Sequence, residues 1–376
     1  MPPENLPGAA LTLRGLRKTY PGQTAVDEVD LDVRSGEFLT FLGPSGSGKT
    51  TTLNMVAGFV APTAGSITMD GQDLLALPPH RRGIGMVFQN YALFPHMTVF
   101  ENIAFPLKQR KYSRDRIRTE VASALEQVSL GGFGDRLPKQ LSGGQQQRVA
   151  VARALVFQPR LLLMDEPLGA LDKNLRESLQ AEIRRLHREL GITFLYVTHD
   201  QEEAIALSDR VAVFDRGRIQ QIGTPDELYD RPATRFVASF LGEANIASGE
   251  AEGERDGTVA VKVDGGVLRA PGSAAAGASV CVVTRPERIR LEQRRGAAGL
   301  NRVSGPIVDL AYLGSSVRLR VEHAPGHSTV MRAPAGTLPP CAVGDTVTLA
   351  WDPRDSVLLP DSPSSTTPHP TKGMPS

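Results

Sequence analysis

Apolar and polar residues alternate along two stretches near the start of the chain. Leu11–Leu16 and Val26–Val33 largely follow this alternation, which is the period of half-exposed antiparallel strands. Two later stretches carry hairpin turns at Asp70-Gly71 and Arg216-Gly217, because glycine supplies the positive φ angle that a tight turn requires. The sequence therefore predicts antiparallel strand pairs near residues 11–33, 70–71 and 216–217.

Other stretches are continuously apolar. Leu161–Met164 and Ile192–Val197 show no alternation, which is typical of parallel strands buried on both faces. Phe38–Leu42 and Ile84–Phe88 are two further apolar strands. Strands of this kind, separated by helical segments, predict an α/β fold.

The period changes to that of a helix after about residue 98. From Thr98 to Gln140, apolar residues recur at three- and four-residue spacings, which predicts helices with one buried face. The segment Val149–Val156 continues this pattern until Gln158-Pro159 ends it, because proline cannot continue a helix. We expect an inserted helical subdomain over about residues 98–157, a charged helix over 173–190 and another from 201 to 207.

The composition shifts beyond Gly242. Ala251–Val357 is rich in Val, Gly, Arg and Pro, and its short alternating stretches predict a small β-barrel; they are Thr258–Val263, Ser279–Thr284, Ser316–Val321 and Thr346–Trp351. The tail is dense in Pro, Ser and Thr and is expected to be disordered. The expected segments are 1–242, 243–358 and 359–376.

Composition narrows the class of protein. The 376 residues suffice for two domains, and a formal charge of +1 gives no overall field that attracts nucleic acid or an anionic bilayer. Cys281 and Cys341 are too few for a disulfide framework, which suits a reducing compartment. We expect an unexported chain with no membrane-spanning segment and no nucleic-acid partner.

The apolar run 38–42 leads into Gly43-Pro-Ser-Gly-Ser-Gly-Lys49-Thr50-Thr51, which fits G-x-x-x-x-G-K-[ST]. A strand that ends in glycines and continues as a helix presents free backbone N–H groups to phosphate oxygens. Gly43, Gly46 and Gly48 would let the backbone close around the phosphates. Lys49 would reach the β- and γ-phosphates and Thr50 would bind Mg²⁺. The alternative, a glycine-rich turn that binds nothing, does not require Lys-Thr after the last glycine.

Two further strands end in candidate catalytic residues. Asp165 and Glu166 follow 161–164, and His199 follows 192–197. The carboxyl ends of strands in open α/β sheets are where ligands bind. Asp165 would orient Mg²⁺ or its waters, Glu166 would activate the water that attacks the γ-phosphate, and His199 would hold that water. The alternative for the two acids is that they cap the next helix.

Two motifs stay open on spacing alone. Tyr20, at the Pro21-Gly22 turn, is either a surface aromatic or a ring that stacks on adenine. Ser142, before Gly143-Gly144, is either an ordinary helix N-cap or part of a ligand site.

The motifs together, in this order, resemble those of ABC-type ATPases over about residues 1–240: the phosphate loop, Gln89, Leu141–Gln145, Asp165-Glu166, the loop ending in Asp172, and His199. Gly169 stands where many members have serine. The resemblance implies an ABC ATPase domain with a helical and an antiparallel β subdomain. It also implies that Tyr20 stacks on adenine.

The resemblance assigns roles to residues of this chain. It implies catalytic roles for Glu166, His199 and Gln89, and Mg²⁺ contacts for Thr50, Gln89 and Asp165. It implies nucleotide contacts for Tyr20, Gly43, Ser45, Gly46, Gly48, Lys49, Thr50, Thr51, Ser142, Gly143, Gly144, Gln145 and Asp172.

The resemblance also implies partners. Two copies would pack head to tail around two ATP molecules, with Ser142, Gly143 and Gly144 of one copy facing the γ-phosphate on the other. The dimer would drive two permease subunits at the cytoplasmic face of the bacterial inner membrane, served indirectly by an extracytoplasmic solute-binding protein. Arg285-Pro286-Glu287 and Tyr312-Leu313-Gly314 resemble the OB-like (TOBE-type) regulatory domain of importer ATPases.

The sequence favours an importer ATPase over two other functions. Tyr91–Asn102 and Arg231–Asn245 look most like spermidine/putrescine import ATPases, with ferric-iron ATPases next. A soluble ABC ATPase of DNA repair or translation would be expected to carry a coiled-coil insertion or two fused ATPase halves. A purely sensory protein with a vestigial ATPase would not need Lys49, Asp165, Glu166 and His199 together.

Overall fold

A computed structural model describes residues 8–169, 173–292 and 299–361. Asp172 and residues 362–376 of the tail that was predicted to be disordered lie outside these ranges. The chain divides into two compact units, Met1–Asp226 and Glu227–Ser376.

The first unit is built on a mainly parallel sheet. Its order, in the described part of the chain, is β10-β9-β3-β8-β7-β6, and only the β10–β9 pair is antiparallel. The continuously apolar runs form its central strands, as the sequence predicts, because both faces of the sheet are covered. The strands are β3 Phe38–Leu42, β6 Ile84–Val87, β7 Leu161–Asp165, β8 Thr193–Thr198, β9 Arg210–Asp215 and β10 Arg218–Gly223.

Successive residues of each strand face opposite layers. Leu162 and Met164 of β7 pack into a core made with α4 Gly143–Leu155 and α5 Lys173–Leu190. Leu161 and Leu163 face the other core, made with α1 Lys49–Ala57 and an antiparallel sheet. That sheet has the order β2-β1-β4-β5, with strands β1 Leu11–Tyr20, β2 Gln23–Val33, β4 Ala64–Met69 and β5 Gln72–Asp73. The predicted alternation at residues 11–16 and 26–33 is confirmed.

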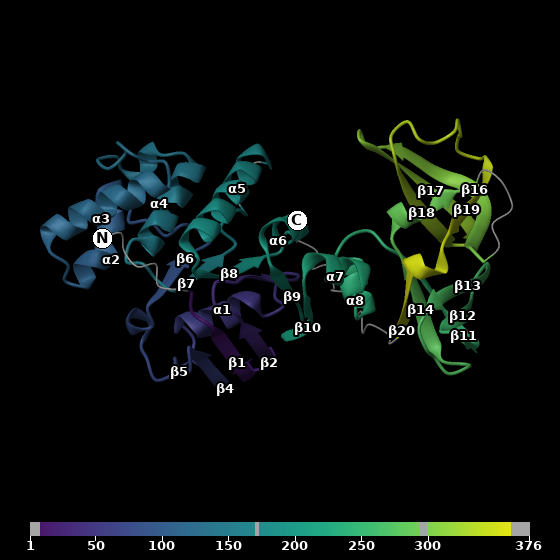
Figure 1. The fold of residues 1–376 in the computed structure, drawn as a ribbon, viewed down its shortest axis with the longest axis horizontal. Helices are drawn as coiled ribbons and strands as arrows, with labels where there is room; N and C mark the ends of the chain where they lie inside the picture. Colours follow the sequence, from purple (N-terminus) through teal and green to yellow (C-terminus); the bar gives the residue numbers. More distant parts are fainter. Residues whose placement is uncertain (1–7, 170–172, 293–298, 362–376) are drawn as a thin grey trace, which may run out of the picture. The chain divides into compact units, whose positions relative to one another are not determined.

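The predicted helical subdomain is present as α2 Val99–Gln109, α3 Arg114–Gln127 and α4, which lie together at one end of the first unit (Figure 1). The Thr98 hydroxyl caps α2 by accepting from the Glu101 N–H, and the Glu101 carboxylate accepts from the Thr98 N–H. After β8 comes α6 Gln201–Leu207, whose N-cap is Asp200. The described residues include no helix long and apolar enough to cross a membrane.

The second unit contains most of α7 Pro225–Asp230, α8 Arg235–Phe240 and two five-stranded antiparallel sheets within its described residues. The sheets close around one apolar core that includes Leu319, Leu349 and Trp351. Their orders are β13-β12-β11-β14-β20 and β15-β19-β16-β17-β18. The strands are β11 Asn245–Arg255, β12 Thr258–Val263, β13 Gly266–Pro271, β14 Ser279–Thr284, β15 Arg290–Leu291, β16 Asn301–Tyr312, β17 Ser316–Ala324, β18 His327–Pro334, β19 Thr346–Trp351 and β20 Ser356–Pro360.

The division between the units falls before α8, whereas the sequence predicts a domain boundary after Gly242. The physical reason is the packing of α8. Its Ala238 lies in a small core with Cys281 and Leu359 of the β sheet, and the buried Arg285 guanidinium donates to the Ala238 carbonyl oxygen at 2.9 Å. The helical segment before Gly242 therefore packs with the β strands that follow it.

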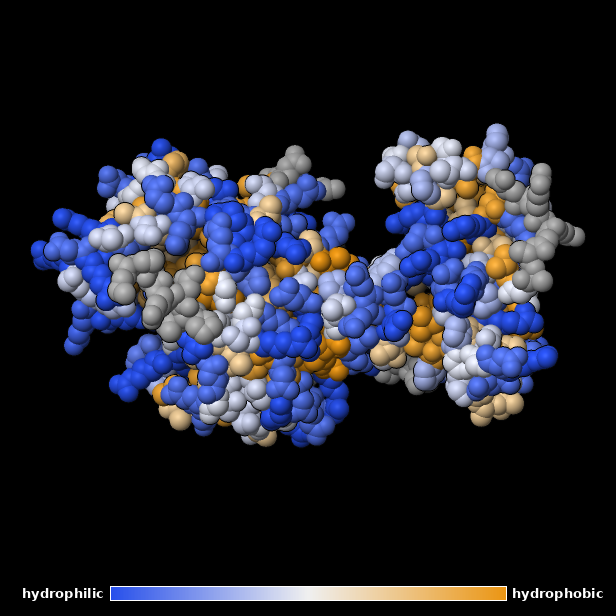
Figure 2. All heavy atoms as spheres, in the orientation of Figure 1, coloured by the Kyte–Doolittle hydropathy of each residue, from blue (hydrophilic) through white to orange (hydrophobic). Residues whose placement is uncertain are grey.

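Figure 2 shows that the visible face of the chain is mainly hydrophilic, with apolar atoms in small areas between charged and polar side chains. The large apolar side chains most exposed among the described residues include Tyr312, Val343 and Phe59. They lie apart in the sequence.

Candidate functional site

Close packing requires glycine at two positions of the phosphate loop. A Cβ atom at Gly43 would lie 2.3 Å from the Phe214 carbonyl oxygen, and one at Gly48 would lie 2.5 Å from the Ala25 carbonyl oxygen. Gly48 also has φ of 102°, which favours glycine. By contrast, a Cβ at the exposed Gly46 meets open space. The loop is thus held against β2 and β9 on one side and is open on the other.

Lys49, the first residue of α1, is only 4% exposed. Its Nζ donates to the carbonyl oxygens of Gly43 at 2.7 Å and Pro44 at 2.9 Å. Burial lowers the pKa of Lys49, while the charges of Glu166 and Asp165 oppose that shift. The ammonium group is therefore a buried charge whose closest partners are neutral, so an incoming phosphate would add a counter-charge in direct contact with it.

Thr50 and Asp165 come together from distant parts of the sequence. The Thr50 hydroxyl at the start of α1 donates to Asp165 Oδ1 at the end of β7, at 3.0 Å. Burial raises the pKa of Asp165, and the Thr50 hydrogen bond and the Lys49 charge partly oppose the rise. A hydroxyl and a carboxylate are the hard oxygen ligands that Mg²⁺ prefers. No group of three His, Cys, Asp or Glu residues suited to a metal occurs in the described part of the chain.

Glu166 lies between two further predicted residues. Its Oε2 accepts from Gln89 Nε2 at 3.3 Å, and its Oε1 lies 3.2 Å from His199 Nδ1. The backbone of Glu166 has φ of 44° and its N–H donates to the Val197 carbonyl oxygen at 2.9 Å. This positive φ turns the Glu166 side chain away from the course of β7, toward the ends of β6 and β8. Residues that follow three neighbouring strands thus meet at one carboxylate.

The remaining predicted residues are not part of this cluster. The Ser142 hydroxyl accepts from the Gln145 N–H, and the Gln145 side chain accepts from the Ser142 N–H, which closes a capping box at the start of α4. Gly143 is exposed, whereas Gly144 is buried. Tyr20 ends β1 at 42% exposure, with the Lys18 ammonium 5.0 Å from its ring centroid. Ser45 is exposed, Thr51 is half-buried, and Asp172 lies outside the described residues.

The sequence interpretation missed Arg153. From α4, its guanidinium donates to the carbonyl oxygens of Tyr91 and Ala92, both at 2.8 Å. Tyr91 and Ala92 both have positive φ, so Arg153 holds an unusual turn just after Gln89. An arginine between two buried alanines of an apolar-faced helix was the only signal in the sequence.

Comparisons with known proteins agree on the type of protein. The profile of the ABC transporter family matches residues 26–169, and the profile of the TOBE domain matches residues 282–359. A spermidine/putrescine import ATP-binding protein PotA of Thermobifida fusca is 48% identical over 361 residues, covering 93% of this chain and 94% of the relative. PotA 1 of Pseudomonas aeruginosa is 46% identical over 370 residues, covering 94% and 97%.

Solved structures resemble more than half of this chain. The ATP-binding cassette MJ0796, as a dimer in a post-hydrolysis state bound to ADP and Pi, has a TM-score of 0.52 and 35% identity, covering 57% of this chain and 98% of that chain. The cbiO1 protein of Clostridium perfringens, part of the cbiONQ ABC transporter complex, has a TM-score of 0.54 and 30% identity, covering 58% and 89%.

Proposed function

This chain belongs to the ATP-binding proteins of ABC transporters, and we propose that it powers the import of spermidine and putrescine. The observation that carries the catalytic part is the Glu166 carboxylate between Gln89 and His199, beside the Thr50–Asp165 pair. The chain is an ATPase of this family. Its assignment to import and to polyamines rests on the names of relatives that match nearly its whole length.

Nucleotide binding would begin at the phosphate loop. Tyr20 would stack on adenine, and the backbone N–H groups from Gly43 to Thr51 would surround the phosphates. Lys49 would exchange its contacts with the Gly43 and Pro44 carbonyl oxygens for contacts with the β- and γ-phosphates. This exchange is favourable because an ion pair with phosphate replaces contacts to neutral carbonyl oxygens.

Hydrolysis would depend on the cluster at the ends of β6, β7 and β8. Thr50 and Asp165 would hold Mg²⁺, which when bound neutralises phosphate charge. Glu166 would accept a proton from the attacking water, and the Gln89 and His199 contacts would orient its two oxygens.

The signature residues would act on the nucleotide of a second copy. Ser142, Gly143 and Gly144 begin a 13-residue helix and present its N-terminal N–H groups, which favour an anion. The ATP-binding cassette MJ0796 is described as dimeric in two solved structures. The dimer would associate with two permease subunits at the cytoplasmic face of the membrane, supplied indirectly by a solute-binding protein.

Mixed dimers test the arrangement. Lys49→Ala damages the phosphate loop, and Gly143→Asp places a carboxylate opposite the γ-phosphate at an exposed position. If the signature acts in trans, a mixture of the two single variants regains hydrolysis, because one site of each mixed dimer has neither change. The matched control mixes wild type with a chain carrying both changes, and these mixed dimers have two damaged sites. If the signature acts within its own chain, the two kinds of mixed dimer, purified from the homodimers, give the reverse result.

The transported solute needs a separate test. Cells that depend on this chain and its permeases should lose uptake of radiolabelled spermidine and putrescine when Lys49→Ala replaces the wild type. Ferric-iron uptake is the alternative that the sequence left open, and the same cells measure it. Loss of iron uptake with unchanged polyamine uptake would reassign the solute and leave the ATPase proposal intact.

A further inference from the structure

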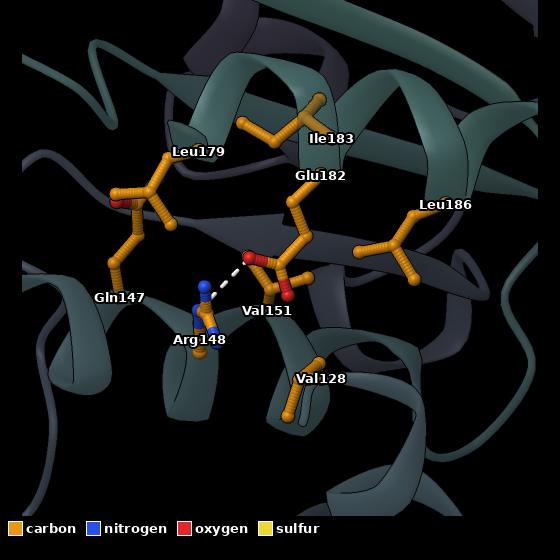
Figure 3. A pocket seen from close by; sticks show the side chains of 8 residues that line it. All are labelled: Val128, Gln147, Arg148, Val151, Leu179, Glu182, Ile183 and Leu186. Carbon is orange, nitrogen blue, oxygen red and sulfur yellow. Dashed lines mark ion pairs between the residues drawn. The ribbon is translucent and has the colours of Figure 1, made fainter. Parts of the chain in front are cut away.

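The helix that carries the signature, α4, packs along α5 in the same direction (Figure 3). Near the start of both helices, a Cβ atom at Gly144 would lie 3.0 Å from Leu175 Cδ1. Further along, the Arg148 Nε atom lies 2.8 Å from Glu182 Oε2. Because both contacts occur in the same order along the two helices, their N-termini lie at the same end. The N-terminus of α4 carries Ser142–Gly144, and α5 begins at Lys173.

The Arg148–Glu182 ion pair is largely enclosed. The side chain of Glu182 is 11% exposed and that of Arg148 is 27% exposed. Apolar residues surround the pair, among them Val151 on α4 and Ile183 and Leu186 on α5 (Figure 3). Removal of Arg148 would leave the largely buried Glu182 carboxylate without its nearest counter-ion, which is costlier than loss of an exposed pair.

The space beside the pair is too small for a ligand. The cavity between α4 and α5 has a volume of about 10 Å³, which is near the minimum for a single water molecule. The pair therefore joins two helices and does not form a binding site. The ion pair also joins one position of α4 to one position of α5, whereas apolar contacts do not depend on direction.

We propose that the Arg148–Glu182 ion pair is a positioning element for ATP hydrolysis that holds the signature residues Ser142–Gly144 at a fixed place relative to α5. Neither side chain touches the nucleotide. The pair acts through α4, by aligning its N-terminus with the γ-phosphate held by a second copy. This inference rests on the proposed trans arrangement of the two sites.

The test compares ATP binding with ATP-driven dimerisation in the full chain. Both are measured in a Glu166→Gln background, where ATP is not consumed, by nucleotide titration and by sedimentation with Mg²⁺-ATP. Arg148→Met should change the nucleotide dissociation constant of the monomer less than about twofold, because the phosphate loop is untouched. It should weaken ATP-driven dimerisation by about tenfold or more, because the signature is no longer aligned.

Three further variants separate positioning from general stability. Arg148→Lys keeps the charge and should recover part of the dimerisation. The exchange of charges, Arg148→Glu with Glu182→Arg, should be less impaired than either single change. Arg116→Met is the matched control, since its partner Glu120 on α3 is 3.6 Å away and the Arg116 side chain is 57% exposed; it should dimerise like the background chain.

The outcomes are distinct. If Arg148→Met is folded at the assay temperature and dimerises with ATP as well as the Arg116→Met control, the inference is wrong. If dimerisation falls only in proportion to a fraction unfolded, measured by circular dichroism, the pair is merely structural and the inference is again wrong. If the Glu166→Gln background itself does not dimerise with ATP, the proposed trans arrangement fails instead.

Discussion

Each of the two units contains a buried cation that donates to backbone carbonyl oxygens, and the two cations serve different purposes. Lys49 in the first unit donates to the carbonyl oxygens of Gly43 and Pro44. Arg285 in the second unit donates to those of Tyr229 and Ala238. Burial lowers the pKa of both groups. In neither case is a carboxylate among these closest partners.

The difference lies in what surrounds each charge. Lys49 is within the electrostatic reach of Asp165 and Glu166, and its loop is open at Gly46, so its flexible ammonium can change partners. All three nitrogens of the planar Arg285 guanidinium donate hydrogen bonds, and the group lies 4.0 Å from the Tyr229 ring centroid. It fixes the chain between α7 and α8 against the β strands. A buried cation thus indicates a ligand site only when its partners are exchangeable.

The largest expected effect is on the stability of the second unit. Arg285→Met removes the donors to the Tyr229 and Ala238 carbonyl oxygens, and should lower the free energy of unfolding by about 3 kcal/mol. Urea denaturation measures this loss, and ATP affinity should stay unchanged. Arg288→Met is the control. The Arg288 side chain is 50% exposed, and its ion pair with Asp230, at 3.4 Å, is on the surface. An equal loss of unfolding free energy in both variants would show that the Arg285 contacts do not stabilise the second unit.

The next effect is on nucleotide affinity. Lys49→Ala should weaken ATP binding by about 1.5 to 3 kcal/mol, because it deletes a charge-assisted contact to phosphate. Isothermal titration with Mg²⁺-ATP measures the change. The second unit should unfold as in wild type. ATP affinity at the wild-type level would mean that Lys49, like Arg285, is only a structural cation.

A smaller effect is expected on turnover. Glu166→Gln should keep ATP binding while steady-state hydrolysis falls at least about tenfold, a loss of roughly 1.4 kcal/mol of transition-state stabilisation. Glu120→Gln on α3 is the control and should leave both quantities unchanged. A wild-type hydrolysis rate in Glu166→Gln would remove Glu166 from its role as base and would leave the Lys49 comparison standing.

The smallest effect concerns Tyr229, whose ring lies against Arg285. Its hydroxyl donates to Glu287 Oε1 at 2.6 Å, so Tyr229→Phe should cost about 1 kcal/mol of stability while the ring contact remains. Burial, assisted by Glu287, raises the pKa of Tyr229 to about 12 from 10.0. Its contribution is therefore complete below pH 10 and is lost as the pH rises through 12.

Denaturation between pH 9 and 12 would measure this difference. The wild type should lose stability more steeply than Tyr229→Phe over that range. Only the wild type has a Tyr229 hydroxyl whose contact with Glu287 is lost when the hydroxyl loses its proton. Parallel curves for the two proteins would show that the Tyr229 hydroxyl does not stabilise the folded state.

The order of the helices and strands, and the residues of the phosphate loop, were determined by the sequence alone. Helix α5 occupies Lys173–Leu190 as predicted, and Arg216-Gly217 turns the β9–β10 hairpin as predicted. These features depend on residues close in the sequence, whose periodicity and turn preferences act locally. The phosphate loop was equally predictable, because a strand, its glycines and the helix that follows are contiguous.

Contacts between distant segments were decided by the tertiary structure. Glu166 meets both Gln89 and His199 because β6, β7 and β8 are neighbours in one parallel sheet, an order that the sequence does not state. The Arg148–Glu182 and Arg285–Ala238 contacts depend on which face of a helix or strand packs against which partner. That choice is made by the whole core, where the gain from burying apolar surface and the cost of burying each charge are balanced together.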